Sequence, residues 1–228
     1  YDINPEQSAK IANSWNLKAF GSLDSLISSA QSQNAVFDLA LPPSAVSNVL
    51  QLPEHATVLI QKPMGSDLEE AKLIKAICER KKLTAAVNFQ LRFSPMMLAL
   101  KDAMSKGHLE RILDLEVHLN LEASWELFPF LKKMERVEIA VHSIHYLDLI
   151  RSFLGTPKSV WAQTLAHPST PDFAQTRTSA ILNYGPEIRC VLSINHNYTK
   201  GPKFQTAQKS FPLKFNCVCQ ELREVIRR

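Results

Sequence analysis

Short apolar runs alternate with segments of helical pattern over residues 1–91. Three of these runs have the length of strands, at 35–41, 56–60 and 83–89, and a short helix is expected over 44–52. Unbroken apolar strands that are separated by helices indicate a parallel sheet covered on both faces. We therefore predict an α/β fold that opens with a doubly wound parallel sheet over residues 1–91.

Helix signals lie between these strands. Asn4-Pro5-Glu6 combines a capping side chain, a proline suited to the first helical position and an acid near the positive end of the helix dipole. Ser66 or Asp67 is expected to cap a longer amphipathic helix. The buried stripe of that helix would consist of Leu68, Ala71, Ile74, Ile77 and Cys78.

The pattern changes after Arg92. Residues 113–121 alternate strictly between apolar and polar side chains, which is typical of a strand with one wet or interfacial side. Further strands are expected over 159–167, 177–184 and 188–197, and helices over 95–106 and 138–154. We predict an α+β domain over residues 92–228, with an open, mainly antiparallel sheet and helices on one face.

Charge and cysteine usage exclude several functions. The net charge of +4 is mild and the basic residues are scattered, so no nucleic-acid partner is expected. No apolar stretch approaches the roughly 18 residues that span a bilayer, and the polar start has no signal-peptide pattern; no membrane partner is expected. The four cysteines follow no zinc pattern, and a reducing, cytoplasmic location is expected.

This type of sheet normally has a glycine-rich turn after its first strand. Sheets that bind dinucleotides open with a strand, a G-x-G-x-x-G turn and a helix, but this chain has six glycines and no such motif. Tyr1-Asp2 fits the end of a second strand, where an acidic residue binds the ribose hydroxyls. We therefore expect that a unit of about 30 residues is missing upstream of Tyr1. The alternative is that Asp2 is an exposed terminal residue without a role.

Four segments stand out: ALPPSAV (40–46), VLIQKPMG (58–65), NFQLRFSP (88–95) and HSIHYLDLIRSFLG (142–155). Together they resemble the Gfo/Idh/MocA oxidoreductases, and the similarity extends from Tyr1 to about residue 197. Their order and spacing are more specific than any one segment alone. The resemblance implies a Rossmann-type dinucleotide-binding domain, whose first strand and glycine-rich turn are missing here, followed by a substrate and oligomerisation domain.

The resemblance implies an NAD(P)-dependent dehydrogenase that acts on CH–OH groups. Oxidation of a secondary alcohol requires a hydride acceptor, which is the cofactor, and a base that takes the hydroxyl proton. By resemblance His145 would be the base, and Lys62 would stabilise the negative charge that develops on the oxygen. In this family Pro63 often follows a cis bond, which turns the lysine into the cleft. Without the resemblance, a lysine before a proline is usually a surface residue.

Cofactor and substrate positions follow from the same segments and from the second domain. The candidate cofactor-binding residues are Asp2, Leu41, Pro42, Pro43, Gln61, Lys62 and Asn88. The candidate substrate-binding residues are Arg92, Trp125, His142 and Asn195. NAD is expected, with NADP as the alternative, because the carboxylate of Asp2 would repel a 2′-phosphate. Trp125 offers a ring face to a sugar, although aromatic residues in such loops more often close a core.

Three positions depart from the family pattern. Gln61 replaces the glutamate of E-K-P, Val141 stands where an aspartate often precedes the histidine by four residues, and Ser143 replaces a glycine. His142 or Glu138 is a candidate for the missing polar group. These departures leave open an alternative function, that of a catalytically inactive regulator that binds the cofactor or a sugar.

A metal-dependent hydrolase is the competing hypothesis from another class. His142, His145 and Asp148 are spaced at i, i+3 and i+6, so they would share one face of a helix, and imidazole and carboxylate at such spacing can bind zinc. No further firm ligand segment accompanies them, and we therefore expect no metal.

The sequence thus predicts an oxidoreductase that transfers a hydride between a nicotinamide cofactor and a secondary alcohol of a sugar, sugar acid or cyclitol. By resemblance the open face of the second sheet forms a subunit interface. A homodimer or homotetramer through that face is expected, because an isologous contact is the default for such a surface.

Overall fold

The computed structural model describes residues 1–31, 33–109, 111–123, 125–199 and 214–217. It divides into two compact units, Tyr1–Asn88 and Phe89–Arg228. Residues 199–228 are described only at Thr199 and at Lys214–Cys217; Cys219 lies outside the described residues.

The first unit contains the predicted parallel sheet. Strands β1 (Val36–Leu39), β2 (Thr57–Ile60) and β3 (Thr84–Val87) pair in parallel in the order β1-β2-β3. Each strand lies inside the range expected from its apolar run. The doubly wound parallel arrangement predicted for this half is therefore confirmed.

Helices α1 (Pro5–Trp15), α2 (Leu23–Gln31) and α3 (Leu68–Arg80) complete this unit. Asn4 caps α1 by accepting from two backbone N–H groups, and Asp67 caps α3 by accepting from the N–H of Glu70 at 2.8 Å. The apolar residues of α3, β2 and the segment before β2 form one core, which consists of Val49, Leu52, Val58, Ile60, Ile74, Ile77 and Cys78.

One local expectation for this unit is wrong, and the structure specifies the helix type for a second. Leu68 is 68% exposed, because it is the first residue of α3 and the stripe that meets the core begins a turn later. The helix expected over 44–52 is a 3₁₀ segment, Pro43–Gln51, which has no capping side-chain hydrogen bond at its start.

The second unit has a five-stranded sheet. Its strands are β4 (Asp114–Asn120), β5 (Ser159–Leu165), β6 (Arg177–Asn183), β7 (Arg189–Asn195) and β8 (Lys214–Cys217), in the order β5-β6-β7-β4-β8. Among the described strands of this sheet, β4 and β7 pair in parallel and the other neighbours are antiparallel. The prediction of a mainly antiparallel sheet is confirmed.

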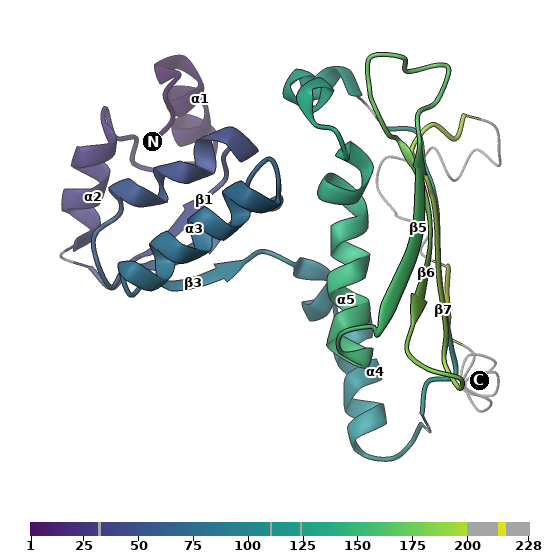
Figure 1. Ribbon diagram of the computed structural model, residues 1–228. Coiled ribbons are helices and arrows are strands. Elements are labelled where there is room, and N and C mark those ends of the chain that lie inside the picture. Colours follow the sequence, from purple (N-terminus) through teal and green to yellow (C-terminus); the bar gives the residue numbers. More distant parts are fainter. Residues whose placement is uncertain (32, 110, 124, 200–213, 218–228) are drawn as a thin grey trace. The chain divides into compact units, whose positions relative to one another are not determined.

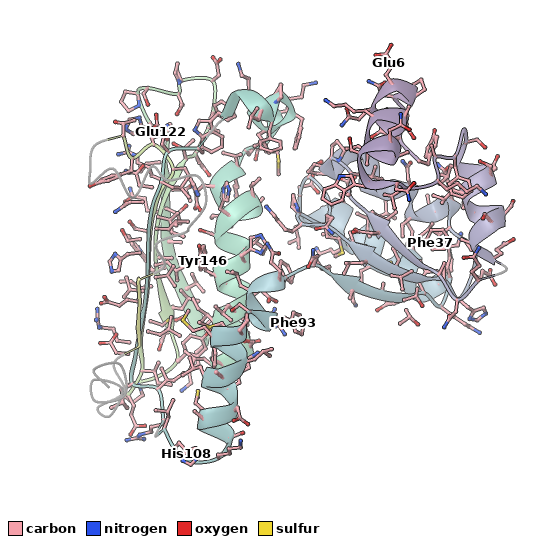
Figure 2. All side chains as sticks on the ribbon, turned by 180° about the vertical axis from the view of Figure 1, so that it is seen from behind. Glu6, Phe37, Phe93, His108, Glu122 and Tyr146 are labelled. Carbon is pink, nitrogen blue, oxygen red and sulfur yellow. The ribbon has the colours of Figure 1, made fainter. Side chains whose placement is uncertain are left out.

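Helices α4 (Pro95–Ser105) and α5 (Ile144–Leu154) run along one face of this sheet (Figure 1). Tyr146 of α5, labelled in Figure 2, packs into the core between helix and sheet. On β4, β6 and β7 alternate residues face this core; on β7 they are Cys190, Leu192 and Ile194. The residues between them lie on the opposite, open face.

The helix expected over 138–154 has two parts. Residues Ile139–Ser143 form a π-helical turn, and α5 begins at Ile144. Such turns are rare and occur often at functional sites. No helix in the described ranges is long and apolar enough to cross a membrane.

Candidate active site

The predicted cofactor residues other than Asp2 lie at the carboxyl ends of the three parallel strands of the first unit. Leu41, Pro42 and Pro43 follow β1, Gln61 and Lys62 follow β2, and Asn88 follows β3. Because the strands are parallel, their carboxyl ends lie at one edge of the sheet, which is where ligands bind in such folds. The sequence had placed these residues at strand ends, and the pairing brings the ends together.

Gln61 joins the three strand ends through its side-chain amide. Its Nε2 donates to Oδ1 of Asp38 at 2.9 Å, and its Oε1 accepts from Nδ2 of Asn88 at 3.0 Å. An amide suits this position because it carries a donor and an acceptor, whereas an ionised glutamate only accepts. Sequence reasoning missed Asp38, although its charge interrupts the apolar run that became β1.

We expect Gln61→Glu, which restores the E-K-P of the family, to destabilise the first unit by about 1–2 kcal/mol. The substitution removes a donor to Asp38 and sets two carboxylates side by side, so the deficit should fade as pH falls through the carboxylate pKa range near 4. Urea unfolding at several pH values measures it.

The double variant Asp38→Asn/Gln61→Glu is the control for this experiment. The new amide at 38 donates to the new carboxylate at 61, and we expect the stability at pH 7 to return to within about 0.5 kcal/mol of wild type. Equal losses of unfolding free energy in the single and double variants would contradict a stabilising hydrogen bond between residues 38 and 61.

Lys62 is held by a loop whose shape depends on Gly65. The Lys62–Pro63 peptide bond is cis, as the resemblance implied. Gly65 has φ +91°, and a Cβ there would lie 2.9 Å from the backbone nitrogen of Ala71, so only glycine lets the loop approach α3 this closely. Lys62 is half-buried, and burial lowers the pKa of its ammonium group from its ordinary value.

Asp2 lies in a hollow of about 300 Å³ at the start of the chain. Tyr1, Ile3 and Phe20 are among the residues that line it. One carboxylate oxygen, Oδ1, accepts from the backbone N–H of Asn4 at 2.8 Å, which fixes the orientation of the group. A carboxylate in a surface hollow fits the ribose-binding role that the sequence predicted.

His145 and His142 lie in the second unit, on either side of the junction between the π-helical turn and α5. His145 is 8% exposed, its Nδ1 is buried, and its ring meets the edge of Phe89 with the centroids 6.1 Å apart. His142 is half-buried and lies against the ring of His196, with the centroids 4.2 Å apart. The π-helical turn contains His142 but not His145, and the two rings contact different residues, His196 and Phe89.

Arg92 and Asp148 form a two-pronged ion pair inside the second unit. Nε and Nη2 of Arg92 donate to the two carboxylate oxygens of Asp148 on α5. The pair raises the pKa of the Arg92 guanidinium, chiefly through the hydrogen bond to Asp148. Asp148 thus orients a neighbouring side chain, and substrate binding by Arg92 stays a prediction.

Two substrate candidates lie elsewhere than expected. Trp125 is 8% exposed, and its ring packs against Phe173 and His196, so it closes a core rather than presenting a face to a sugar. Asn195 lies on the open face of the sheet, because its neighbour Ile194 faces the core with α5 and side chains alternate along a strand. Asn195 is therefore on the side of the sheet away from His145.

A buried polar group that the sequence only touched on lies beside these histidines. Glu138 is fully buried and accepts hydrogen bonds from the hydroxyls of Ser143 and Thr178. Thr178 was missed, although it is the polar member of an inward-facing series that continues with Ala180 and Leu182. Within the described residues, no group of three or more His, Cys, Asp or Glu side chains is arranged to hold a metal ion.

Residues 1–89 match the model of the Gfo/Idh/MocA family, described as an oxidoreductase family with an NAD-binding Rossmann fold. These residues form a domain of that family. The match confirms the resemblance for the first unit, which contains the motifs at 40–46 and 58–65, and the NAD cofactor expected from the sequence is the one that the family description gives.

A curated relative agrees with the family assignment. Glucose-6-phosphate 3-dehydrogenase of Bacillus subtilis (strain 168) is 30% identical over 121 residues, which cover 52% of this chain and 33% of that protein. The chain thus spans about a third of that relative's length.

Solved structures of similar fold cover both units. An oxidoreductase from Agrobacterium radiobacter, in complex with NAD⁺, L-tartaric acid and magnesium, has a TM-score of 0.72 at 18% identity, over 88% of this chain and 59% of that one. UDP-N-acetylglucosamine 3-dehydrogenase from Acidithiobacillus ferrooxidans has a TM-score of 0.68 at 20% identity, over 87% and 61%. These likenesses show the α/β fold of the family. The cytoplasmic location and the homo-oligomer stay predictions.

Proposed function

We propose that this chain carries the cofactor edge and the catalytic residues of a dehydrogenase that oxidises a secondary alcohol of a sugar, sugar acid or cyclitol with NAD. The observation that carries the proposal is the cluster at the carboxyl edge of the parallel sheet. There a half-buried lysine with a lowered pKa stands beside three strand ends that Gln61 joins.

The residues present fit a nicotinamide dinucleotide. The carboxylate of Asp2 would bind the ribose hydroxyls, and Leu41 to Pro43, Gln61 and Asn88 would border the cofactor at the strand ends. Bound there, the cofactor would supply the hydride acceptor. Lys62 would donate from Nζ to the substrate oxygen and stabilise its negative charge, and His145 would take the hydroxyl proton at Nε2, since its Nδ1 is buried.

The substrate class rests on the similar proteins. The curated relative acts, by its name, on glucose 6-phosphate at carbon 3, and one solved structure is a UDP-N-acetylglucosamine 3-dehydrogenase. Both names describe oxidation of a ring hydroxyl of a sugar. Arg92 and His142 remain the candidates for substrate contact from the second unit.

Two assays on the whole purified protein, whose intact mass is checked first, test this proposal. NADH titration followed by fluorescence should show saturable binding in the micromolar range. A panel of sugars, sugar acids and cyclitols with NAD⁺ should then give NADH formation with at least one compound. A protein that neither binds NADH nor turns over any member of the panel would overturn the proposal.

A regulator without turnover is the second candidate, and one observation favours it. Val141 is 9% exposed and packs in a core cluster with Trp125 and Phe173, so an apolar side chain occupies the position where the family often has an aspartate. Saturable NADH binding without turnover of any compound in the panel would support this candidate over the dehydrogenase.

We also propose that the open face of the second sheet forms the subunit interface. Trp161, Ile181 and Val191 are cross-strand neighbours on this face, and Trp161 and Ile181 are 59% and 51% exposed. An apolar row across an exposed sheet marks an interaction surface.

Trp161→Glu should shift the assembly to monomer, because it replaces the large apolar side chain at the β5 end of the row with a charge, and sedimentation velocity measures the change. The matched control is Leu98→Glu on α4, at a residue that is 49% exposed and lies outside this face; it should leave the assembly intact. A wild-type protein that is monomeric at micromolar concentration would contradict the proposed interface.

A further inference from the structure

Glu138 is a helical residue directly before the π-helical turn, and it is completely buried. Its backbone N–H donates to the carbonyl of Gln175 at 3.2 Å, which ties the residue to the segment before β6. Ionisable residues are rarely buried without partners, so the contacts of this carboxyl group show what it is used for.

Both oxygens of Glu138 are engaged within the protein. Oε1 accepts from the hydroxyl of Ser143 at 2.6 Å, and Oε2 accepts from the hydroxyl of Thr178 on β6. Nδ1 of His196, at the end of β7, lies 3.7 Å from Oε1. The carboxyl group thus links the turn to β6 and lies close to His196, the residue after β7. It is turned toward these partners, and we assign it no contact with a substrate.

The link to Ser143 depends on the π-helical geometry. Glu138 and Ser143 are five residues apart, which in an α-helix would set them about 140° apart around the axis. In a π-helical turn residues five apart lie above one another, because the hydrogen bonds run from i to i+5. The hydrogen bond between these side chains is therefore made where the turn is widened, and it stabilises that turn.

The turn sets the direction of the two histidines that follow Glu138. His142 lies inside it, against His196, whose ring in turn meets the edge of Trp125 at 6.0 Å. His145 follows it in the first turn of α5. If the turn relaxed to α-helical winding, one residue would be released and His142 would rotate by about 100° relative to α5.

We propose that Glu138, through Ser143 and Thr178, is a positioning residue that holds the π-helical turn Ile139–Ser143 and thereby fixes the orientation of His142 and His145. Val141 has no carboxyl group. Glu138, about one turn earlier, has one, and it acts by holding the backbone of the π-helical turn. The effect on catalysis rests on the proposed function, in which His145 takes the proton. The effect on the orientation of the two rings is independent of that function.

Thr178→Val and Ser143→Ala test this inference in the whole protein, because each removes one hydroxyl donor and leaves Glu138 in place. Thr178→Ser is the matched control that keeps the hydroxyl. Glu138→Gln is the conservative variant, since one hydroxyl can keep donating to the amide oxygen and the other can rotate to accept from the amide nitrogen. The first readout is the NMR spectrum of histidine rings labelled with ¹⁵N, and the second is kcat and KM with the Kd for NADH.

We expect the ring signals of His142 and His145 to move in Thr178→Val and in Ser143→Ala, and to stay in place in Thr178→Ser and Glu138→Gln. With a turned-over substrate, kcat should fall at least tenfold in the first pair, while the Kd for NADH changes less than twofold. Unchanged ring signals in folded Thr178→Val and Ser143→Ala would overturn the inference, even if both melt at lower temperature. A wild-type protein without turnover, whose rings still respond in this way, would overturn the proposed function and support the positioning role.

Discussion

Lys62→Met should lower kcat/KM for the oxidation of a sugar or polyol by about 10²–10³-fold, the loss that follows removal of one donor from a developing oxyanion. Methionine keeps most of the volume of the side chain and removes the charge. The Kd for NADH should change less than the turnover does, because Lys62 is assigned to the reacting oxygen. Steady-state kinetics and NADH fluorescence on the same sample separate the two effects.

The same variant should be more stable than wild type at neutral pH. Burial lowers the pKa of Lys62 below its ordinary value of 10.5, so the folded chain holds the lysine proton less tightly than the unfolded chain does. The charged lysine therefore costs stability at every pH below its folded pKa. That cost shrinks as pH rises toward 10.5, and the gap between variant and wild type in urea unfolding should close over this range. A functional group held at a cost to the fold is a common trade-off.

Lys72→Met is the matched control, because Lys72 is an exposed residue of α3 that pairs with Glu69 on the surface. It should leave turnover and NADH binding within twofold of wild type. If Lys62→Met and Lys72→Met had the same turnover, the catalytic role of Lys62 would be wrong.

His145→Asn should lower kcat by about 10²–10⁴-fold, the range that a positioned general base contributes. Asparagine is close to histidine in size and can fill the space beside Phe89, but it cannot take a proton. The variant should also lose the fall in rate at acid pH, since that limb reports protonation of the base. A pH–rate profile of kcat/KM for both proteins measures this.

His108→Asn serves as control, because His108 is exposed in the loop that follows α4. Its pH profile should match that of wild type. A His145→Asn variant that keeps both the rate and the acid limb would remove His145 from the mechanism and leave Lys62 as the remaining candidate for the proton acceptor.

The parallel sheet was predictable because its strands are short, apolar and separated by helical segments. Residue order alone placed Gln61 and Lys62 after one strand and Asn88 after another, and parallel pairing then had to bring them to one edge. The cap of α1 at Asn4 was equally predictable, since a side-chain acceptor before Pro5 serves the first free N–H groups wherever the helix packs.

Contacts between distant segments were not predictable in the same way. The π-helical turn arises where Glu138 meets Thr178 of β6, 40 residues later in the chain, and no periodicity signals such a meeting. Trp125 has the same appearance in sequence whether it stacks on a sugar or closes a core; the choice depends on Phe173 and His196, which come from other segments. The alternation along β7 showed that Asn195 and Ile194 face opposite sides of the sheet. Which of the two sides packs against α5 depended on tertiary packing.

The bridge from Gln61 to Asp38 has a consequence for recognising related chains. A search pattern that demands glutamate before the lysine passes over any protein that has moved its negative charge to the neighbouring strand. In a sequence comparison the two positions should therefore be considered as a pair. An acid at 38 is expected together with an amide at 61, and an acid at 61 is expected together with a residue at 38 that can donate a hydrogen bond to it. Chains that carry acids at both positions should be rare, and a count of the pair among homologous sequences would show whether this exchange is a general variant of the motif.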